Sequence, residues 1–104
     1  MTVQEIDVDE LDTRMAAGAV TVDVRELDEW QEIRVPGVIH IPLGEIQDRF
    51  AEIPEADELL LICKAGGRSM KAAEFLHSQG RGVLNVAGGT TAWVKSGRPT
   101  ESGS

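Results

Sequence analysis

Apolar residues recur along this chain in two forms, as short continuous runs and as longer stretches with helical spacing. Continuous runs are typical of strands buried in a parallel sheet, and spaced stretches are typical of helices that cover it. The expected strands are Val3 to Ile6, Val20 to Val24, Val38 to Ile41, Leu59 to Cys63 and Val83 to Val86. The expected helices are Asp9 to Ala17, Asp28 to Glu32, Gly44 to Phe50, Ser69 to Gln79 and Thr90 to Lys95. This alternation implies right-handed crossovers, and so predicts an α/β fold with a five-stranded parallel sheet and helices on both faces.

The ends of two helices carry further signals. Asp9 is placed to cap the first helix, in which Leu11 and Met15 lie on one face. Ser69 is placed to cap the fourth helix, and Gly80 is placed to end it. Both helices therefore have defined starts and an apolar face to turn toward the sheet.

The length of the chain, 104 residues, fits one domain over residues 1–97, and 41% hydrophobic residues supply one core. Residues 98–104 are predicted to form a flexible C-terminal tail. No run approaches the roughly 18 to 20 apolar residues that span a bilayer, and Met1 to Glu5 lacks the features of a signal peptide. Together with a single unpaired cysteine, this favours a cytoplasmic protein without membrane contact.

The net charge is -8, from 18 acidic and 10 basic residues. Proteins that bind nucleic acid need a basic face for phosphate contacts, so this charge argues against nucleic acid as a partner. It would also repel small anions at long range. Screening beyond about 8 Å at physiological salt lets a local cationic site override that field. A protein partner with a basic docking face is the other interpretation of the charge.

Cys63, the one cysteine, ends the run Leu59 to Ile62 and begins a loop. The loop comprises Cys63, Lys64, Ala65, Gly66, Gly67, Arg68 and Ser69. Two glycines let the backbone bend so that several N–H groups face one point, at the start of a helix. These amides and the cations Lys64 and Arg68 would favour negative charge above the Cys63 sulfur. The loop is therefore a candidate anion-binding cradle.

The same field favours thiolate over thiol, so the pKa of Cys63 is expected to lie below its ordinary value of about 8.5. An ionised sulfur in an anion pocket is a nucleophile for anionic substrates. A lone cysteine after an apolar strand is otherwise a common core residue. The two neighbouring cations, Lys64 and Arg68, argue against a purely structural core cysteine, because buried charges need partners. The pattern therefore favours a reactive thiol.

Four segments in order carry a family resemblance. They are Asp23-Val24-Arg25-Glu26 with Glu29-Trp30, then Val35 to Leu43, then Cys63 to Arg68, and finally Gly88 to Trp93 with Gly97-Arg98-Pro99. Together they resemble the single-domain rhodanese-like sulfurtransferases, over nearly the whole chain. In that superfamily the sulfur-transferring loop is similar in length to this one, with six residues from Cys63 to Arg68. Related phosphatases and arsenate reductases have one residue more.

The resemblance implies that Cys63 takes a sulfane sulfur from a small anionic donor such as thiosulfate, forming a persulfide. A thiol, cyanide or an acceptor protein would then remove that sulfur. The donor would lie against the loop residues Lys64, Ala65, Gly66, Gly67, Arg68 and Ser69. No metal or organic cofactor is expected, and His40 and His77 have no second ligand at metal spacing. Asp23 and Arg25 are expected to form an interior pair that fixes the backbone beneath the site.

Two other functions remain open at the level of the sequence. A non-catalytic or regulatory rhodanese-like module would bind a protein partner through the same fold. A cysteine-dependent phosphatase would use the same nucleophile, although the shorter loop argues against it. One position also departs from the family pattern, since Ile33-Arg34 stands where relatives commonly have Gly-His. Arg34 is expected to pair with the acidic stretch Glu26 to Glu32.

Overall fold

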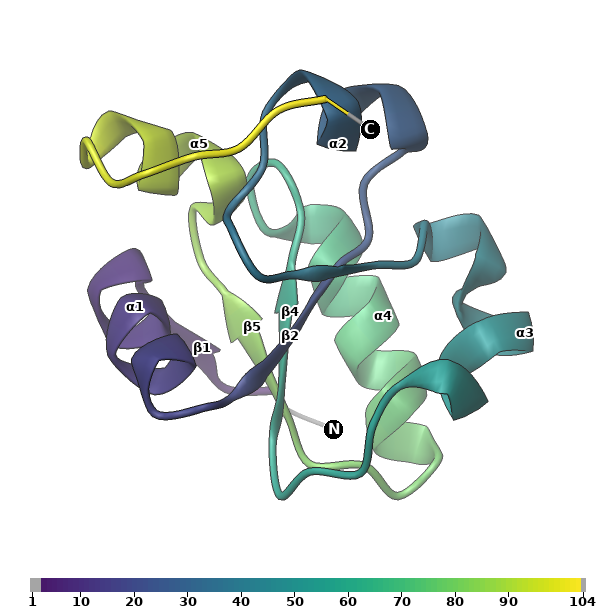
Figure 1. The fold of residues 1–104 in the computed structure, drawn as a ribbon. Helices are drawn as coiled ribbons and strands as arrows, with labels where there is room; N and C mark the ends of the chain where they lie inside the picture. The colour runs from purple at the N-terminus through teal and green to yellow at the C-terminus, as the bar shows by residue number, and fades with distance from the viewer. Residues whose placement is uncertain (1–2, 104) are drawn as a thin grey trace.

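Five parallel strands form the centre of the structure, a computed structural model that describes residues 3–103. The strands run in the order β1-β5-β4-β2-β3 (Figure 1). They are β1 (Glu5–Ile6), β2 (Val20–Asp23), β3 (Ile39–His40), β4 (Leu59–Ile62) and β5 (Val83–Val86). The predicted parallel sheet is confirmed, and the bounds of β5 are those expected from the sequence.

Helices cover both faces of this sheet (Figure 1). They are α1 (Val8–Ala16), α2 (Leu27–Glu32), α3 (Ile46–Arg49), α4 (Gly67–Ser78) and α5 (Gly89–Lys95). Alternate residues of β4 point to opposite faces, as the pleat of a strand requires. Leu59 and Leu61 pack toward α3 and α4, whereas Leu60 and Ile62 pack toward α1 and α5. The fully apolar run of β4 is therefore explained by burial on both faces.

The other predicted strands are one or two residues too long. β1 lacks Val3 and Gln4, and β3 consists of two residues. Val24 and Cys63 lie just beyond their strands, because the last ladder pair joins Asp23 and Ile62. Both residues are nevertheless buried, which explains why hydrophobicity alone extended the strands over them.

Three helix predictions need correction. The cap of α1 is Asp7, whose carboxylate accepts the Glu10 N–H at 2.9 Å, so Asp9 lies in the first turn instead. The cap of α4 is Gly66, not Ser69, whose hydroxyl points inward. The helix expected over residues 44–50 is divided into α3 and two flanking 3₁₀ turns, Leu43–Glu45 and Phe50–Glu52. An inward partner for Ser69 could not be inferred from local pattern.

Residues 99–103 contact the domain at several points, and the flexible tail expected over 98–104 stays a prediction. Arg34 and Glu101 form an antiparallel bridge, with N···O distances of 2.9 and 3.0 Å between their backbones. The indole N–H of Trp93 donates to the carbonyl of Pro99 at 2.8 Å. Figure 1 shows this segment crossing from α5 toward α2. Ser104 lies outside the described residues.

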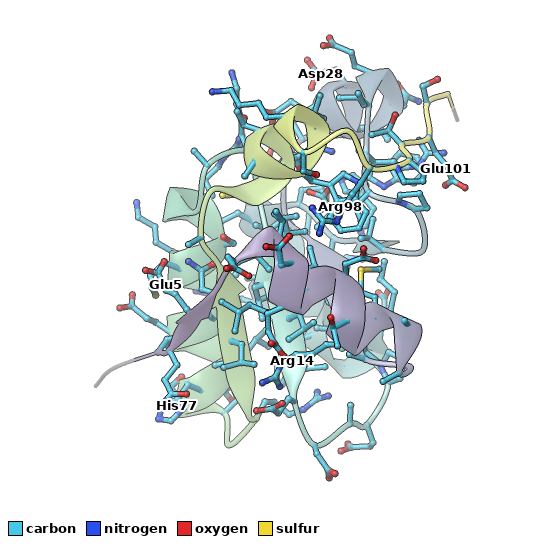
Figure 2. The ribbon with its side chains drawn as sticks, turned by 90° about the vertical axis from the view of Figure 1, so that its left-hand side faces the viewer. Glu5, Arg14, Asp28, His77, Arg98 and Glu101 are labelled. Carbon is cyan, nitrogen blue, oxygen red and sulfur yellow. The ribbon has the colours of Figure 1, made fainter. Side chains whose placement is uncertain are left out.

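Arg98 ties the start of the same segment to α1. Its guanidinium forms ion pairs with Asp9 and Asp12 of that helix. Figure 2 shows Arg98 in this position, between α1 and the C-terminal segment. These two ion pairs join α1 to a segment about 86 positions later in the chain. Among residues 3–103 no helix is long and apolar enough to cross a membrane.

Candidate active site

The loop after β4 encloses the sulfur of Cys63. The exposed fraction of Cys63 is 1%, although Lys64 and Ala65 beside it are exposed. The amide of Gly66 donates to Sγ over 3.0 Å, and Oγ of Ser69 lies 3.3 Å from Sγ. The predicted cradle of N–H groups around a thiol is therefore present, with a hydroxyl as a further donor.

These donors decide the ionisation of the thiol. Burial raises the pKa of Cys63, whereas the Ser69 hydroxyl and the amides of Ser69, Gly66 and Ala65 lower it. The hydrogen bonds together outweigh burial, so the pKa lies below its ordinary value. The predicted direction is confirmed. Its main favourable causes are the hydroxyl and the amides rather than the cations Lys64 and Arg68.

Gly66 is required by the shape of the loop. Its φ is +111°, in the left-handed region that residues with a Cβ rarely adopt. This conformation turns the Gly66 amide back toward Cys63 and begins α4 at Gly67. Gly67 itself is helical and has open space where a Cβ would lie. The two neighbouring glycines therefore have different physical roles.

The Gly88-Gly89 turn contacts the backbone of the active loop. A Cβ at Gly89 would collide with the carbonyl oxygens of Cys63 and Lys64. The amide of Thr90 donates to the Cys63 carbonyl at 2.8 Å, and that of Thr91 donates to the Lys64 carbonyl at 3.1 Å. The first turn of α5 thus fixes the backbone of Cys63 and Lys64.

Arg68 does not face the sulfur as a free cation. Its guanidinium forms two hydrogen bonds with the Glu29 carboxylate of α2, at 2.7 and 2.9 Å. The hydrogen bond from Arg68 lowers the pKa of Glu29 to about 2, with smaller help from the Glu26 amide and Arg25 against burial. Lys64 forms no ion pair with any of residues 3–103. Of the two predicted cations, Lys64 is therefore the uncompensated one.

Asp23 and Arg25 form the interior pair expected at the end of β2. The guanidinium of Arg25 and the carboxylate of Asp23 are 2.9 Å apart, and both side chains are almost fully buried. Arg25 also donates to the carbonyl of Ile33 at 2.7 Å, and its own carbonyl lies 2.7 Å from Nε2 of His40. Arg25 therefore joins the end of β2 to Ile33, just after α2, and to His40 of β3.

Arg34 forms no ion pair with the carboxylates of Glu26 to Glu32. Its guanidinium lies 3.7 Å from the ring of Trp30 and donates to the Trp30 carbonyl at 3.0 Å. Its carboxylate partner is Glu101, at 3.7 Å, so that expectation was wrong. The C-terminal segment supplies this partner. Trp30 stacks on His40 on its other face, with ring centroids 5.1 Å apart.

A pocket of about 440 Å³ opens beside the loop, between α2 and α5. The hydroxyl of Thr90 is buried there and has no hydrogen-bond partner among the described residues. No cluster of three potential metal ligands occurs within residues 3–103. The pocket is lined by Arg25, Glu29, Glu32, Ile33, Lys64, Thr90, Thr91, Val94 and Lys95.

The sequence pattern did not indicate three residues of the site. Glu29 binds Arg68, Thr90 supports Cys63 through its amide, and Asn85 of β5 contacts both Ser69 and Gly66. Asn85 had one visible signal, because it is a polar residue inside the apolar run Val83–Val86. Such a residue must find buried partners. The identity of those partners depends on how the strands assemble.

The family-model comparison matches residues 7–96 to the rhodanese-like domain. The chain belongs to this family. The rhodanese-like chain is 36% identical over 100 residues to a sulfurtransferase of Allochromatium vinosum, covering 93% of this chain and 94% of that protein. It is 45% identical over 74 residues to YrkF of Bacillus subtilis, covering 70% of this chain but only 40% of YrkF.

A solved structure shows the same fold. The crystal structure of a thiosulfate sulfurtransferase from Pseudomonas aeruginosa superposes with a TM-score of 0.87 at 27% identity. The match covers 98% of the rhodanese-like chain described here and 21% of that protein. The domain therefore occurs both as nearly a whole protein and as a part of longer ones.

Proposed function

We propose that this rhodanese-like protein is a sulfurtransferase that carries a sulfane sulfur as a persulfide on Cys63. The observation that carries the proposal is the enclosed Cys63 sulfur, which faces the Gly66 amide and the Ser69 hydroxyl. A thiolate stabilised by such donors is an activated nucleophile. The sulfurtransferase name of the Allochromatium vinosum relative supports the same reaction class.

The first half-reaction loads the enzyme. The Cys63 thiolate attacks the outer sulfur of thiosulfate, a sulfur–sulfur bond forms to Sγ, and the bond inside thiosulfate breaks. Sulfite leaves with the electron pair of that bond, so no oxidant or reductant is consumed. The loop amides and the neighbouring cationic charge stabilise the negative charge on the outer sulfur. Thiosulfate as the donor is further supported by the similar Pseudomonas aeruginosa structure.

The second half-reaction unloads the enzyme. The thiolate of a small thiol or of an acceptor protein, or cyanide, attacks the outer sulfur of the persulfide. The bond to Sγ breaks, its electron pair returns to Cys63, and the thiolate is regenerated. Sulfur itself carries the exchange, so neither half-reaction calls for a metal or an organic cofactor.

The pocket beside the loop is the proposed entrance for the donor. Lys64 and Lys95 bring positive charge to its lining, and neither forms an ion pair with any residue from 3 to 103. This local charge opposes the net charge of -8 and attracts a small anion at short range.

The test is an intact-mass measurement after incubation with thiosulfate. A mass gain of one sulfur atom, removed by a reductant and absent in Cys63→Ala, is the expected result. If wild-type protein gains no sulfur, the sulfurtransferase proposal fails. Hydrolysis of an aryl phosphate as fast as sulfur transfer would favour the phosphatase. An alkylation profile typical of an ordinary thiol would favour a non-catalytic interaction module.

A further inference from the structure

Asn85 is a polar residue buried at the centre of the site. It lies in β5, is fully buried, and faces α4 on the same side of the sheet as Cys63. Its side-chain N–H groups donate to the Gly66 carbonyl at 3.0 Å and to the Glu5 carboxylate at 2.9 Å. Its Oδ1 lies 2.5 Å from Oγ of Ser69. One side chain therefore joins β1, the active loop and the first turn of α4.

These partners determine which way the amide points. Both groups near Nδ2 are oxygen acceptors, the Gly66 carbonyl and the Glu5 carboxylate. Rotating the amide by half a turn would place its oxygen against two acceptors and leave both without a donor. Oδ1 of Asn85 is thus held as a fixed acceptor in front of Ser69.

The Ser69 hydroxyl has a single proton and two neighbouring acceptors. Oδ1 of Asn85 is 2.5 Å from its oxygen, and Sγ of Cys63 is 3.3 Å away. A protonated thiol donates to the Ser69 oxygen, and the Ser69 hydroxyl donates in turn to Oδ1 of Asn85, so all groups are satisfied. A thiolate has no proton to give and draws the hydroxyl proton to itself. Forming the nucleophile therefore costs the hydrogen bond between Ser69 and Asn85.

We propose that Asn85 is a positioning residue that competes with Cys63 for the Ser69 hydroxyl proton and thereby limits the stability of the thiolate. It acts through Ser69 and does not touch the reacting atoms. The inference rests on the proposed function only in treating Cys63 as the nucleophile. It predicts that an apolar residue at position 85 makes the thiolate more stable, whereas loss of a purely structural support would make it less stable.

The charged groups around Cys63 are the same in wild type and in Asn85→Leu. Lys64 and Arg68 belong to its own loop and to α4, and Glu29 of α2 is held by Arg68. The buried pair Asp23 and Arg25 lies at the end of β2, next to β4. Glu5 of β1 contacts Asn85 on the side away from Ser69. Comparison of wild type with Asn85→Leu therefore tests the competition for one proton without a change of charge.

The experiment measures the rate of Cys63 alkylation by iodoacetamide against pH, followed by intact mass. Cys63 is the only cysteine, so every adduct reports on this thiol. Asn85→Leu frees the Ser69 proton for the sulfur and should speed alkylation below neutral pH about threefold, within the range of one neutral hydrogen bond. Asn85→Asp provides a stronger acceptor and a negative charge, and should slow it. Slower or unchanged alkylation in Asn85→Leu overturns the proposal.

The double variant with Ser69→Ala shows whether Ser69 carries the effect. Asn85→Leu should leave the alkylation profile unchanged when Ser69 is already absent. An equal effect in both backgrounds would show that Asn85 acts by holding the loop backbone, and would overturn the proposal. If Asn85→Leu does not fold, the Asp variant decides, because unchanged or faster alkylation contradicts the competition. No sulfur donor is used, so a missing persulfide would sink the sulfurtransferase proposal alone.

Discussion

The guanidinium of Arg68 holds both carboxylate oxygens of Glu29, at 2.7 and 2.9 Å. This pair joins the active loop, at the start of α4, to α2 across 39 positions of sequence. Bidentate pairs of this kind fix orientation as well as charge. Arg68 therefore stabilises the loop from outside, and its positive charge is largely compensated by Glu29. In the proposed reaction, the cationic contribution to donor binding would therefore fall mainly to Lys64.

The pair makes stability depend on pH. Arg68 lowers the pKa of Glu29 from 4.5 to about 2, so this carboxylate binds protons less readily in the folded state than in the unfolded state. Its contribution is complete above pH 4.5 and is lost as the pH falls toward 2. Glu29→Gln should therefore have a lower melting temperature than wild type at neutral pH. The difference in melting temperature between the two proteins should disappear as the pH is lowered, as measured by thermal unfolding at a series of pH values.

Glu32→Gln is the matched control for this prediction. Glu32 lies on the same helix, is exposed, and forms no ion pair with any residue that the structure describes. Removing its charge should change the melting temperature little and without a trend over the same pH range. A gap for Glu29→Gln that stays constant down to pH 2 would contradict the assigned cause.

Two adjacent glycines of the loop allow a second comparison. Gly66→Ala places a Cβ on a residue with φ of +111° and should cost about 1 to 3 kcal/mol of stability. The same change should shift the amide that donates to Cys63 and slow its alkylation at neutral pH. Gly67→Ala enters open space in the first turn of α4 and should be neutral or slightly stabilising. Equal losses in unfolding free energy would refute the role of the left-handed conformation.

Substitution of Lys64 tests whether positive charge in the pocket beside the loop helps to bind the donor. Lys64→Ala should raise the KM for thiosulfate about threefold, comparable to an exposed ion pair, and leave the melting temperature nearly unchanged. Lys71→Ala removes the same charge from an exposed position on α4 that does not line the pocket. Its KM should match that of wild type. Steady-state kinetics at constant ionic strength compare the KM values of the two variants. An equal rise in KM for both would indicate a long-range effect of net charge.

The sequence predicted the fold where the pattern is local. The apolar runs of β4 and β5 and the stripe of α4 depend only on neighbouring residues, so these elements were found to within two residues. The start of α1 was missed because Asp7 and Asp9 are equally good caps in sequence. Which carboxylate accepts the Glu10 amide depends on the backbone angle at which the chain leaves β1.

The same distinction between local and distant contacts holds for the candidate site. The contact of Cys63 with the Gly66 amide spans three residues, and the loop motif alone predicted it. The contact with the Ser69 hydroxyl spans six residues, but the motif indicated a helix cap at Ser69 instead. The partners Glu29 and Asn85 come from α2 and β5, 39 and 16 positions from Arg68 and Ser69. Only the packed sheet brings those elements to the loop. No periodic pattern encodes which polar side chain meets which, so Arg68 was assigned to the donor rather than to Glu29.

Oxidation gives a last prediction, since the donors that stabilise the Cys63 thiolate also make it reactive toward peroxide. Peroxide converts the thiolate to a sulfenic acid, and the chain has no second cysteine to trap it as an internal disulfide. Unloaded protein should therefore proceed to sulfinate and stay inactive after a reductant is added. Protein loaded with thiosulfate should recover, because the outer sulfur takes the oxygen and reduction of the sulfur–sulfur bond restores the thiolate. Equal recovery of the two samples, read by activity and intact mass, would mean that the thiolate is not activated or that the persulfide does not accumulate.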